Sequence, residues 1–342
     1  FERKVVPNLE KIASDNINFS NTNKLGGAQM PAAGSSWTVA GMVSSSSGVP
    51  LKLPSKMDDN GYTGYGSFLP GVYSLGEILD DNGYHNYLFI GSDASFGGRR
   101  DYFTYHGDYT IHDYVYAKEQ KWIDNDYYVW WGYEDSKLFD FAKDDLLEIA
   151  EKEEPFNFTL LTTNTHFIDG YIDKGCKSPF DEQYLNAYYC SDSQLGDFIN
   201  WLKKQDFYKN TTIVITGDHL TMQANISEMF DIDNPNEYNR TIYNAFINSK
   251  IKADKTKNRI FTTYDFYPTI LASLGFEISG NRLGLGTNLF SDRKTLAEEI
   301  GLNKFNKELK LKSQYYDEIL LGGLEGELNA SSSSSTSSSS SS

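Results

Sequence analysis

Short apolar runs alternate along the chain with longer segments of helical periodicity. Residues Thr212–Thr216 form a largely apolar run that stops at Gly217, which predicts a buried strand. The aromatic and β-branched runs Tyr84–Ile90 and Asn157–Thr163 predict two more strands. Amphipathic spacing bounded by capping or breaking residues predicts helices over Ser74–Asn82, Ser136–Glu153, Tyr184–Lys204 and Thr263–Leu274.

This alternation predicts an α/β fold with a mostly parallel central sheet and helices on both faces. No linker-like change of composition interrupts the chain before about residue 323, so we expect one domain over residues 1–323. From Ala330 onward the sequence is serine with a single threonine, and such a tract cannot bury apolar surface. Residues 324–342 are therefore expected to form a disordered Ser-rich tail.

The chain carries 31 basic and 47 acidic residues, a formal net charge of −16. A surface of this sign repels nucleic acid and anionic membrane faces, which disfavours a nucleic-acid-binding protein. Aromatic residues make up 15%, including 24 tyrosines, and suit either glycan contact or the edges of a core. No apolar run approaches the roughly 18 residues that a membrane-spanning helix needs. Because the chain opens at Phe1, we interpret it as a fragment of a longer protein.

Two of the predicted strands are followed by a histidine. Thr212–Thr216 leads into Asp218 and His219, and Asn157–Thr163 leads into His166. Carboxyl ends of parallel strands meet at one edge of a sheet, and carboxylate and imidazole groups there suit Mn²⁺ or Zn²⁺. The alternative is that Asp218 and His219 only cap the next segment and that His166 is structural. Finding both strands with the same ending favours a site.

Two further segments carry groups suited to an anion. Ser35, Ser36 and Thr38 follow a glycine, and they either cap a helix or present a nucleophilic hydroxyl at its N-terminus. The glycine-rich segment Gly91–Arg99 follows a predicted strand, and Arg99 could hold a phosphate with two hydrogen bonds. The alternative for this segment is a solvated loop, since it matches neither a dinucleotide fingerprint nor a P-loop.

Cys176 and Cys190 are the only cysteines. A disulfide between them would close a loop of about 15 residues and stabilise the fold by about 3 kcal/mol. The even count fits an oxidising compartment, and two free thiols are the alternative. No pattern assigns chemistry to the other histidines, and the adjacent tryptophans are interpreted as packing residues; these residues are His85, His106, His112, Trp130 and Trp131.

Six motifs occur in order along the chain, within a resemblance that runs from about Val6 to Tyr316: SSWTVAGM with the following GVPL, GSDASFGGR, TTNTHF-x-DGY, ITGDHLTM, DFYPT and GLG. In this order they resemble the phosphoglycerol transferase branch of the sulfatase and alkaline-phosphatase superfamily, which includes the lipoteichoic acid synthases. The resemblance implies an alkaline-phosphatase/sulfatase-like α/β fold. It also implies a bound divalent metal, with Mn²⁺ expected before Mg²⁺ or Zn²⁺.

The resemblance assigns roles to the residues singled out above. It implies that Thr38 is both the nucleophile and a metal ligand, and that Asp218 and His219 are metal ligands. His166 would contact the phosphate or the transition state, and Arg99 would hold the phosphate or the glycerol.

One further hydroxyl competes for the role of nucleophile. Ser36 is the alternative to Thr38, because a small shift of the motif would place the family's hydroxyl there.

The reaction implied by the resemblance has two steps. Thr38 displaces diacylglycerol from phosphatidylglycerol, and a glycan hydroxyl then displaces Thr38, with His166 as acid or base. N-terminal membrane helices, absent from this chain, would hold the domain on the periplasmic or extracytoplasmic side of the inner membrane. A Cys176–Cys190 bridge could form there.

One expected ligand is missing from the chain. The family has a further acidic metal ligand on its first strand, and Glu2 lies too close to Val6 to be that residue. We therefore expect this chain to lack the first central strand, to bind metal weakly and to turn over little or no substrate.

Three alternatives stay open at this point. A sulfatase is disfavoured because no Cys/Ser-x-Pro-x-Arg string surrounds Ser35, Ser36 or Thr38. A phosphoethanolamine transferase would use the same threonine chemistry, but its relatives usually carry more disulfides than two cysteines allow. The third is a non-catalytic domain that binds a glycan or a lipid headgroup, which the presence of all the motif residues disfavours.

Overall fold

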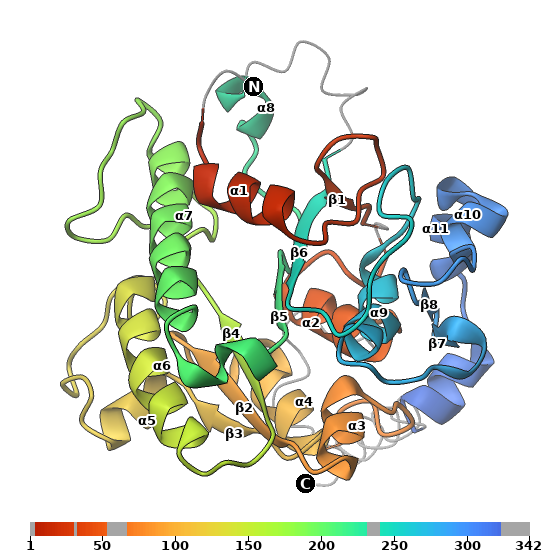
Figure 1. The fold of residues 1–342 in the computed structure, drawn as a ribbon, viewed down its shortest axis with the longest axis horizontal. Coiled ribbons are helices and arrows are strands. Elements are labelled where there is room, and N and C mark those ends of the chain that lie inside the picture. Colours follow the sequence, from red (N-terminus) through yellow and green to blue (C-terminus); the bar gives the residue numbers. More distant parts are fainter. Residues whose placement is uncertain (1–3, 31–32, 53–66, 231–239, 323–342) are drawn as a thin grey trace, which may run out of the picture.

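The computed structural model describes residues 4–30, 33–52, 67–230 and 240–322. Within these ranges, helices surround two three-stranded sheets and a small two-stranded one (Figure 1). The predicted Ser-rich tail, residues 324–342, lies outside the described residues. No helix in the described ranges is long and apolar enough to cross a membrane.

The first sheet is parallel, and two of its strands end near the histidine and arginine that the sequence singles out, His166 and Arg99. Strand β2 (His85–Ile90) lies between β3 (Thr110–His112) and β4 (Phe156–Leu161). Helix α3 (Leu75–Asp81) precedes β2 and begins at Ser74, whose hydroxyl accepts from the backbone N–H of Glu77 in a capping box. The helix and both longer strands agree with the sequence predictions to within two residues at each end.

The second sheet is antiparallel, and its strand β5 is less buried than the sequence predicts. Strand β6 (Ile242–Ile247) pairs with β5 (Ile213–Thr216) and with β1 (Gly27–Ala28). The run predicted as a buried strand forms β5, but its side chains are half-buried and Thr216 is exposed. The reason is that, among the described strands, β5 has a partner only on the β6 side.

Helices cover both faces of the first sheet, as the sequence predicts. Tyr87 and Phe89 of β2 pack with helices α6 and α7, whereas the intervening Leu88 packs with α2 and α4. Phe158 of β4 and Ile213 of β5 both pack against the cluster under α6 and α7, so the two sheets share one core. The chain also contains β7 (Arg282–Leu283), β8 (Gly286–Thr287), α1 (Pro7–Asp15), α2 (Thr38–Ser47), α4 (Arg99–Tyr105), α5 (Tyr114–Glu119), α6 (Asp135–Ala150), α7 (Gln183–Leu202), α8 (Ile226–Met229), α9 (Phe266–Ser273), α10 (Leu296–Ile300) and α11 (Leu302–Leu309).

A disulfide joins the loop before α7 to the helix itself. Cys176 and Cys190 are bonded, with their Cα atoms 5.5 Å apart. Cys190 is fully buried on α7, so the bond fixes the preceding loop to a helix that packs in the core.

Candidate active site

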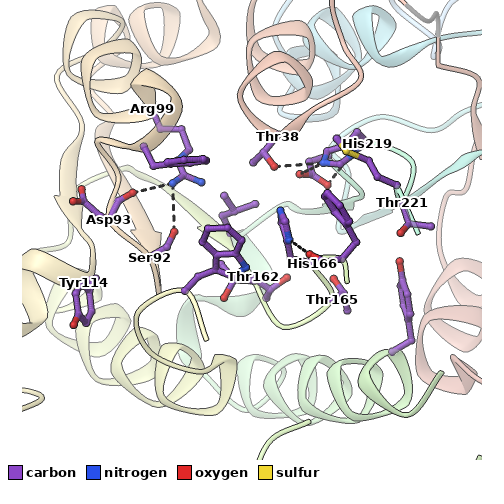
Figure 2. A pocket seen from close by; sticks show the side chains of 18 of the residues that line it. Thr38, Ser92, Asp93, Arg99, Tyr114, Thr162, Thr165, His166, His219 and Thr221 are labelled. Atoms are coloured by element: carbon purple, nitrogen blue, oxygen red, sulfur yellow. Dashed lines mark hydrogen bonds and ion pairs between the residues drawn. The ribbon is translucent and has the colours of Figure 1, made fainter. Parts of the chain in front are cut away.

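A pocket of about 460 Å³ opens at the carboxyl ends of β2, β4 and β5 (Figure 2). Its lining includes the five residues that the sequence singles out for chemistry: Thr38, Arg99, His166, Asp218 and His219. Each comes from a different segment except the adjacent Asp218 and His219, which follow β5 directly. The strand-end argument therefore predicts the location, because the loops after β2, β4 and β5 converge at one edge.

Thr38 stands at the first position of helix α2 and faces His219. Its Oγ1 lies 3.4 Å from His219 Nε2. The expectation that Ser35 or Ser36 caps this helix is wrong, since the residue before the helix is Trp37 and no side chain caps it. Because β-region dihedrals at Trp37 turn the chain just before the helix, Thr38 is the hydroxyl presented to the pocket, and Ser36 is not among its lining residues.

His219 is oriented by a backbone hydrogen bond. Its Nδ1 lies 2.8 Å from the carbonyl oxygen of Leu220, which can only accept, so Nδ1 carries the hydrogen. Nε2 then presents a lone pair toward Thr38 Oγ1 and toward Asp218 Oδ2, 3.5 Å away. A carboxylate, an imidazole nitrogen and a hydroxyl thus face one point.

Gly41 sets how closely helix α2 approaches this point. A Cβ at Gly41 would lie 2.1 Å from the backbone oxygen of Asp218. Real Cβ atoms do not come that close, so the contact requires glycine. One turn of helix separates Gly41 from Thr38, and this contact therefore holds the hydroxyl against the end of β5.

Arg99 is a buried cation that forms no direct ion pair with a carboxylate of the described residues. Gly97 and Gly98 have φ of 70° and 77°, and this left-handed turn starts helix α4 at Arg99. Its Nη2 donates to the carbonyl oxygen of Asp93 at 2.8 Å, while Nε has no partner among the described residues. Burial lowers the pKa of Arg99 to about 10, so the guanidinium stays charged at neutral pH. Such a group suits an anion in the pocket.

His166 lies in the loop after β4 with its Nδ1 on the carbonyl of Phe167. Nε2 is therefore the nitrogen available to a ligand, and burial lowers the pKa of the imidazole, which favours the neutral form. The loop is tied down by Tyr184 of α7, whose hydroxyl donates to the Thr165 carbonyl at 3.0 Å and also contacts Thr221. Tyr184 thus connects the loops after β4 and β5.

Sequence reasoning missed the aromatic residues of the pocket, and it misassigned one of them. Trp131 was expected to be a packing residue, yet it lines the pocket with 36% of its surface exposed, and its ring centroid lies 4.7 Å from that of His166. No sequence signal marks the turn that presents it, since the left-handed residue of this turn is Trp130 rather than glycine or asparagine. The remaining histidines lie outside this pocket and pair with carboxylates: His85 with Glu154, His106 with Glu77 and His112 with Asp145.

The donor set fits a divalent cation but is incomplete in the described residues. Thr38 Oγ1, Asp218 Oδ2 and His219 Nε2 are oxygen and nitrogen donors of the kind that hold Mn²⁺ or Zn²⁺. No group of three or more His, Cys, Asp or Glu side chains suited to a metal occurs in the described ranges. The three donors therefore provide part of a coordination sphere.

The fold and this pocket define the class of protein. The model of the family described as Sulfatase matches residues 1–276, and the chain belongs to this family. The family that the resemblance implies is therefore confirmed, and curated relatives of this chain carry the name phosphoglycerol transferase I. Phosphoglycerol transferase I of Xanthomonas axonopodis pv. citri is 32% identical over 293 residues, covering 84% of this chain and 40% of that protein. The chain thus spans well under half of that relative's length.

Two solved structures share the fold. The lipoteichoic acid synthase LtaP from Listeria monocytogenes matches with a TM-score of 0.64 at 18% identity, over 84% of this chain and 69% of that one. The Streptococcus pyogenes phosphoglycerol transferase GacH, solved with sn-glycerol-1-phosphate, matches with a TM-score of 0.54 at 12% identity, over 93% and 83%. The alkaline-phosphatase/sulfatase-like fold class is confirmed.

Proposed function

We propose that this domain transfers phosphoglycerol from phosphatidylglycerol to a glycan through a covalent intermediate on Thr38. The observation that carries the proposal is the placement of Thr38 Oγ1, 3.4 Å from His219 Nε2, in one pocket with the buried cation Arg99. A hydroxyl at a helix N-terminus in one pocket with a guanidinium that has no direct ion pair suits a phosphate diester, because both favour its negative charge. The name of the phosphoglycerol transferase I relatives supports the choice of transferred group.

In the first step Thr38 Oγ1 attacks phosphorus while Arg99 holds a non-bridging oxygen. The bond between phosphorus and the diacylglycerol oxygen breaks, and the proton lost by Thr38 balances the proton gained by diacylglycerol. His166, with Nε2 facing the pocket, is the group we assign to carry that proton. A divalent cation on Thr38, Asp218 and His219, with Mn²⁺ preferred over Mg²⁺ or Zn²⁺, would lower the pKa of the Thr38 hydroxyl and neutralise phosphoryl charge.

In the second step a hydroxyl of the glycan acceptor attacks the same phosphorus from the open side of the pocket. The bond from phosphorus to Thr38 Oγ1 breaks, and the threonine regains a proton while the acceptor loses one. His166 then acts as the base for the acceptor hydroxyl. The products are a phosphoglycerol-substituted glycan and the free enzyme.

The remaining metal ligand is proposed to come from an additional strand between the two sheets. Among the described strands, β4 pairs only with β2 and β5 only with β6. Both nevertheless pack on the same core cluster, and their side chains are half-buried. A strand that joins these two edges would end beside Asp218 and His219, where an acidic residue completes the donor set.

The proposed location of the protein in the cell follows from the proposed donor lipid. Phosphatidylglycerol lies in the membrane, so we propose that the complete protein is anchored in the inner membrane with this domain on the periplasmic or extracytoplasmic side. The Cys176–Cys190 disulfide supports an oxidising compartment.

A second candidate function is a non-catalytic domain that binds a glycan or lipid headgroup. The incomplete set of metal-ligating side chains in the described ranges is the observation that favours it. A sulfatase is disfavoured, because no Cys/Ser-x-Pro-x-Arg string is present at the pocket hydroxyls.

Release of diacylglycerol from phosphatidylglycerol in the presence of Mn²⁺ separates these candidates. We expect release by a chain that includes the upstream strand, and at least about a thousandfold less by its Thr38→Ala variant. Binding of glycerol phosphate without any release, at any metal concentration, would support the binding domain instead.

A further inference from the structure

Trp130 and Trp131 form the tip of a two-residue hairpin. The backbones of Val129 and Gly132 exchange hydrogen bonds of 2.8 and 3.0 Å on either side of the pair. Trp130 has a φ of 58°, a left-handed conformation that glycine or asparagine usually supplies in such turns. Strained backbone of this kind is retained mainly at functional sites, so the turn calls for an explanation beyond packing.

The hairpin is fastened to the ends of two strands. Gly132 bridges to Ser92 just after β2, and the backbone N–H of Tyr133 donates to the Gly91 carbonyl at 2.8 Å. Trp130 Nε1 donates to the carbonyl oxygen of Thr163 just after β4, at 3.0 Å. Trp130 thus anchors the turn, and the turn holds Trp131 in the pocket.

Trp131 belongs to an aromatic wall, which we define as Phe96, Tyr114, Tyr128 and Trp131. The ring centroids of Phe96 and Trp131 are 6.0 Å apart, and those of Tyr114 and Tyr128 are 5.8 Å apart. All four line the pocket, with 51% of Phe96 and 63% of Tyr128 exposed. Tyr114 lies on the Arg99 and Asp93 side of the pocket, away from Thr221 (Figure 2).

We propose that the aromatic wall is the subsite for a neutral sugar ring of the acceptor, which stacks on Trp131. This inference rests on the proposed function and assigns the acceptor end of the same pocket. Because the Trp131 ring lies 4.7 Å from that of His166, a sugar stacked there brings a hydroxyl next to the group assigned as its base. The guanidinium carbon of Arg99 lies 5.6 Å from the centroid of the Phe96 ring. The phosphate that Arg99 binds would therefore lie next to the sugar on the aromatic wall.

The wall fits a sugar better than a lipid surface. Its rings are rigid and amphipathic, and the carboxylate of Asp93 stands on the same side of the pocket to accept from sugar hydroxyls. The Tyr114 hydroxyl donates to the Tyr127 carbonyl at 2.6 Å, so that ring is fixed in place.

Titration of the chain with maltotriose, followed by saturation-transfer NMR, tests the proposal without requiring turnover. We expect Trp131→Ala to raise the Kd for maltotriose about tenfold, and Trp131→Phe to stay within about threefold of wild type. Tyr128→Ala is matched by Tyr315→Ala, since the two tyrosines are 63% and 64% exposed and only Tyr128 lines the pocket. Only the Tyr128 variant should weaken binding. Glycerol phosphate binding, measured by calorimetry on the same variants, should not change.

The proposal is overturned if wild type does not bind maltotriose, or if Trp131→Ala binds it as wild type does. It is also overturned if Trp131→Ala and Tyr128→Ala keep their sugar affinity but lose binding to phosphatidylglycerol vesicles, because the wall is then a lipid contact. Loss of both maltotriose and glycerol phosphate binding in Trp131→Phe would show a structural role. None of these readouts needs phosphoryl transfer, so a failure of the proposed function leaves them interpretable.

Discussion

At the scale of single residues, the geometry of the pocket favours one of the two candidate nucleophiles, Thr38 and Ser36, between which the sequence does not decide. Thr38 is the first residue of α2 and lies 3.4 Å from His219 Nε2, whereas Ser36 precedes the helix and does not line the pocket. Residue types and their positions after strands predicted the composition of the site. They could not predict which hydroxyl faces the pocket, because that depends on the backbone turn at Trp37.

The first prediction concerns the choice of nucleophile. Thr38→Ala should reduce turnover in the extended chain at least about a thousandfold, because no other described hydroxyl lies beside His219 Nε2. Ser36→Ala serves as the matched control and should keep most of the activity. Diacylglycerol release measures both, and the reverse ranking of the two variants would place the nucleophile at Ser36.

The second prediction concerns the buried cation. Arg99→Lys should raise the Kd for glycerol phosphate about tenfold, because an ammonium cannot reproduce the planar, two-point contact of a guanidinium. Arg282→Lys is the control, since Arg282 lies outside the pocket and pairs with Glu299. Isothermal titration calorimetry gives both constants. Equal affinities in wild type and Arg99→Lys would exclude Arg99 as the phosphate ligand.

At the scale of elements, the apolar pattern predicts most of what forms the site. The four helices and three strands that the sequence predicts lie within about three residues of their predicted bounds, and the carboxyl ends of these strands converge on the pocket. The half-buried state of β5 was not predictable, because a short apolar run has the same appearance whether one or two neighbouring strands cover it. The hairpin at Trp130 was also missed, since its left-handed turn has no glycine or asparagine to signal it.

The third prediction concerns the contact between α2 and the end of β5. Gly41→Ala should destabilise the fold by about 1–3 kcal/mol through overpacking. It should also lower turnover about a hundredfold, because it displaces Thr38 from Asp218. Gly196→Ala is the control, since a Cβ there would lie 2.6 Å from the Asn8 side chain, in a different contact. Urea unfolding and diacylglycerol release separate the two effects. Full activity in Gly41→Ala would contradict the proposed role of this contact.

The fourth prediction concerns the loop before α7. Replacing Cys176 and Cys190 together by serine should lower the free energy of unfolding by about 3 kcal/mol, because the reduced loop gains freedom in the unfolded chain. Urea unfolding of wild type with and without a reducing agent provides the comparison, and the reduced wild type should match the double variant. Identical unfolding curves for oxidised and reduced wild type would contradict the prediction.

At the scale of the whole molecule, the two sheets share one core but no hydrogen-bonded ladder in the described residues. Among the described strands, the edge of β4 away from β2 and the edge of β5 away from β6 are unpaired, which explains why the side chains of both strands are half-buried. The motifs predicted the family, whereas the arrangement of the sheets emerges only when strands distant in sequence are placed side by side.

The fifth prediction concerns this arrangement. A chain extended by its upstream segment should bind Mn²⁺ at least about tenfold more tightly than residues 1–342, because an added strand supplies a carboxylate to the pocket. Calorimetry on the two chains measures the difference. Substitution of the added acidic residue by its amide should remove the gain, and equal affinities for the two chains would contradict the additional strand.

The most direct test of covalent transfer through Thr38 is the intact mass of the protein after reaction. The extended chain is incubated with Mn²⁺ and phosphatidylglycerol, in the absence of acceptor, beside its Thr38→Ala variant. We expect an added mass of about 154 Da, a glycerophosphoryl group, on wild type and none on the variant. An adduct that persists in Thr38→Ala, or diacylglycerol release from wild type with no adduct at any time, would contradict it.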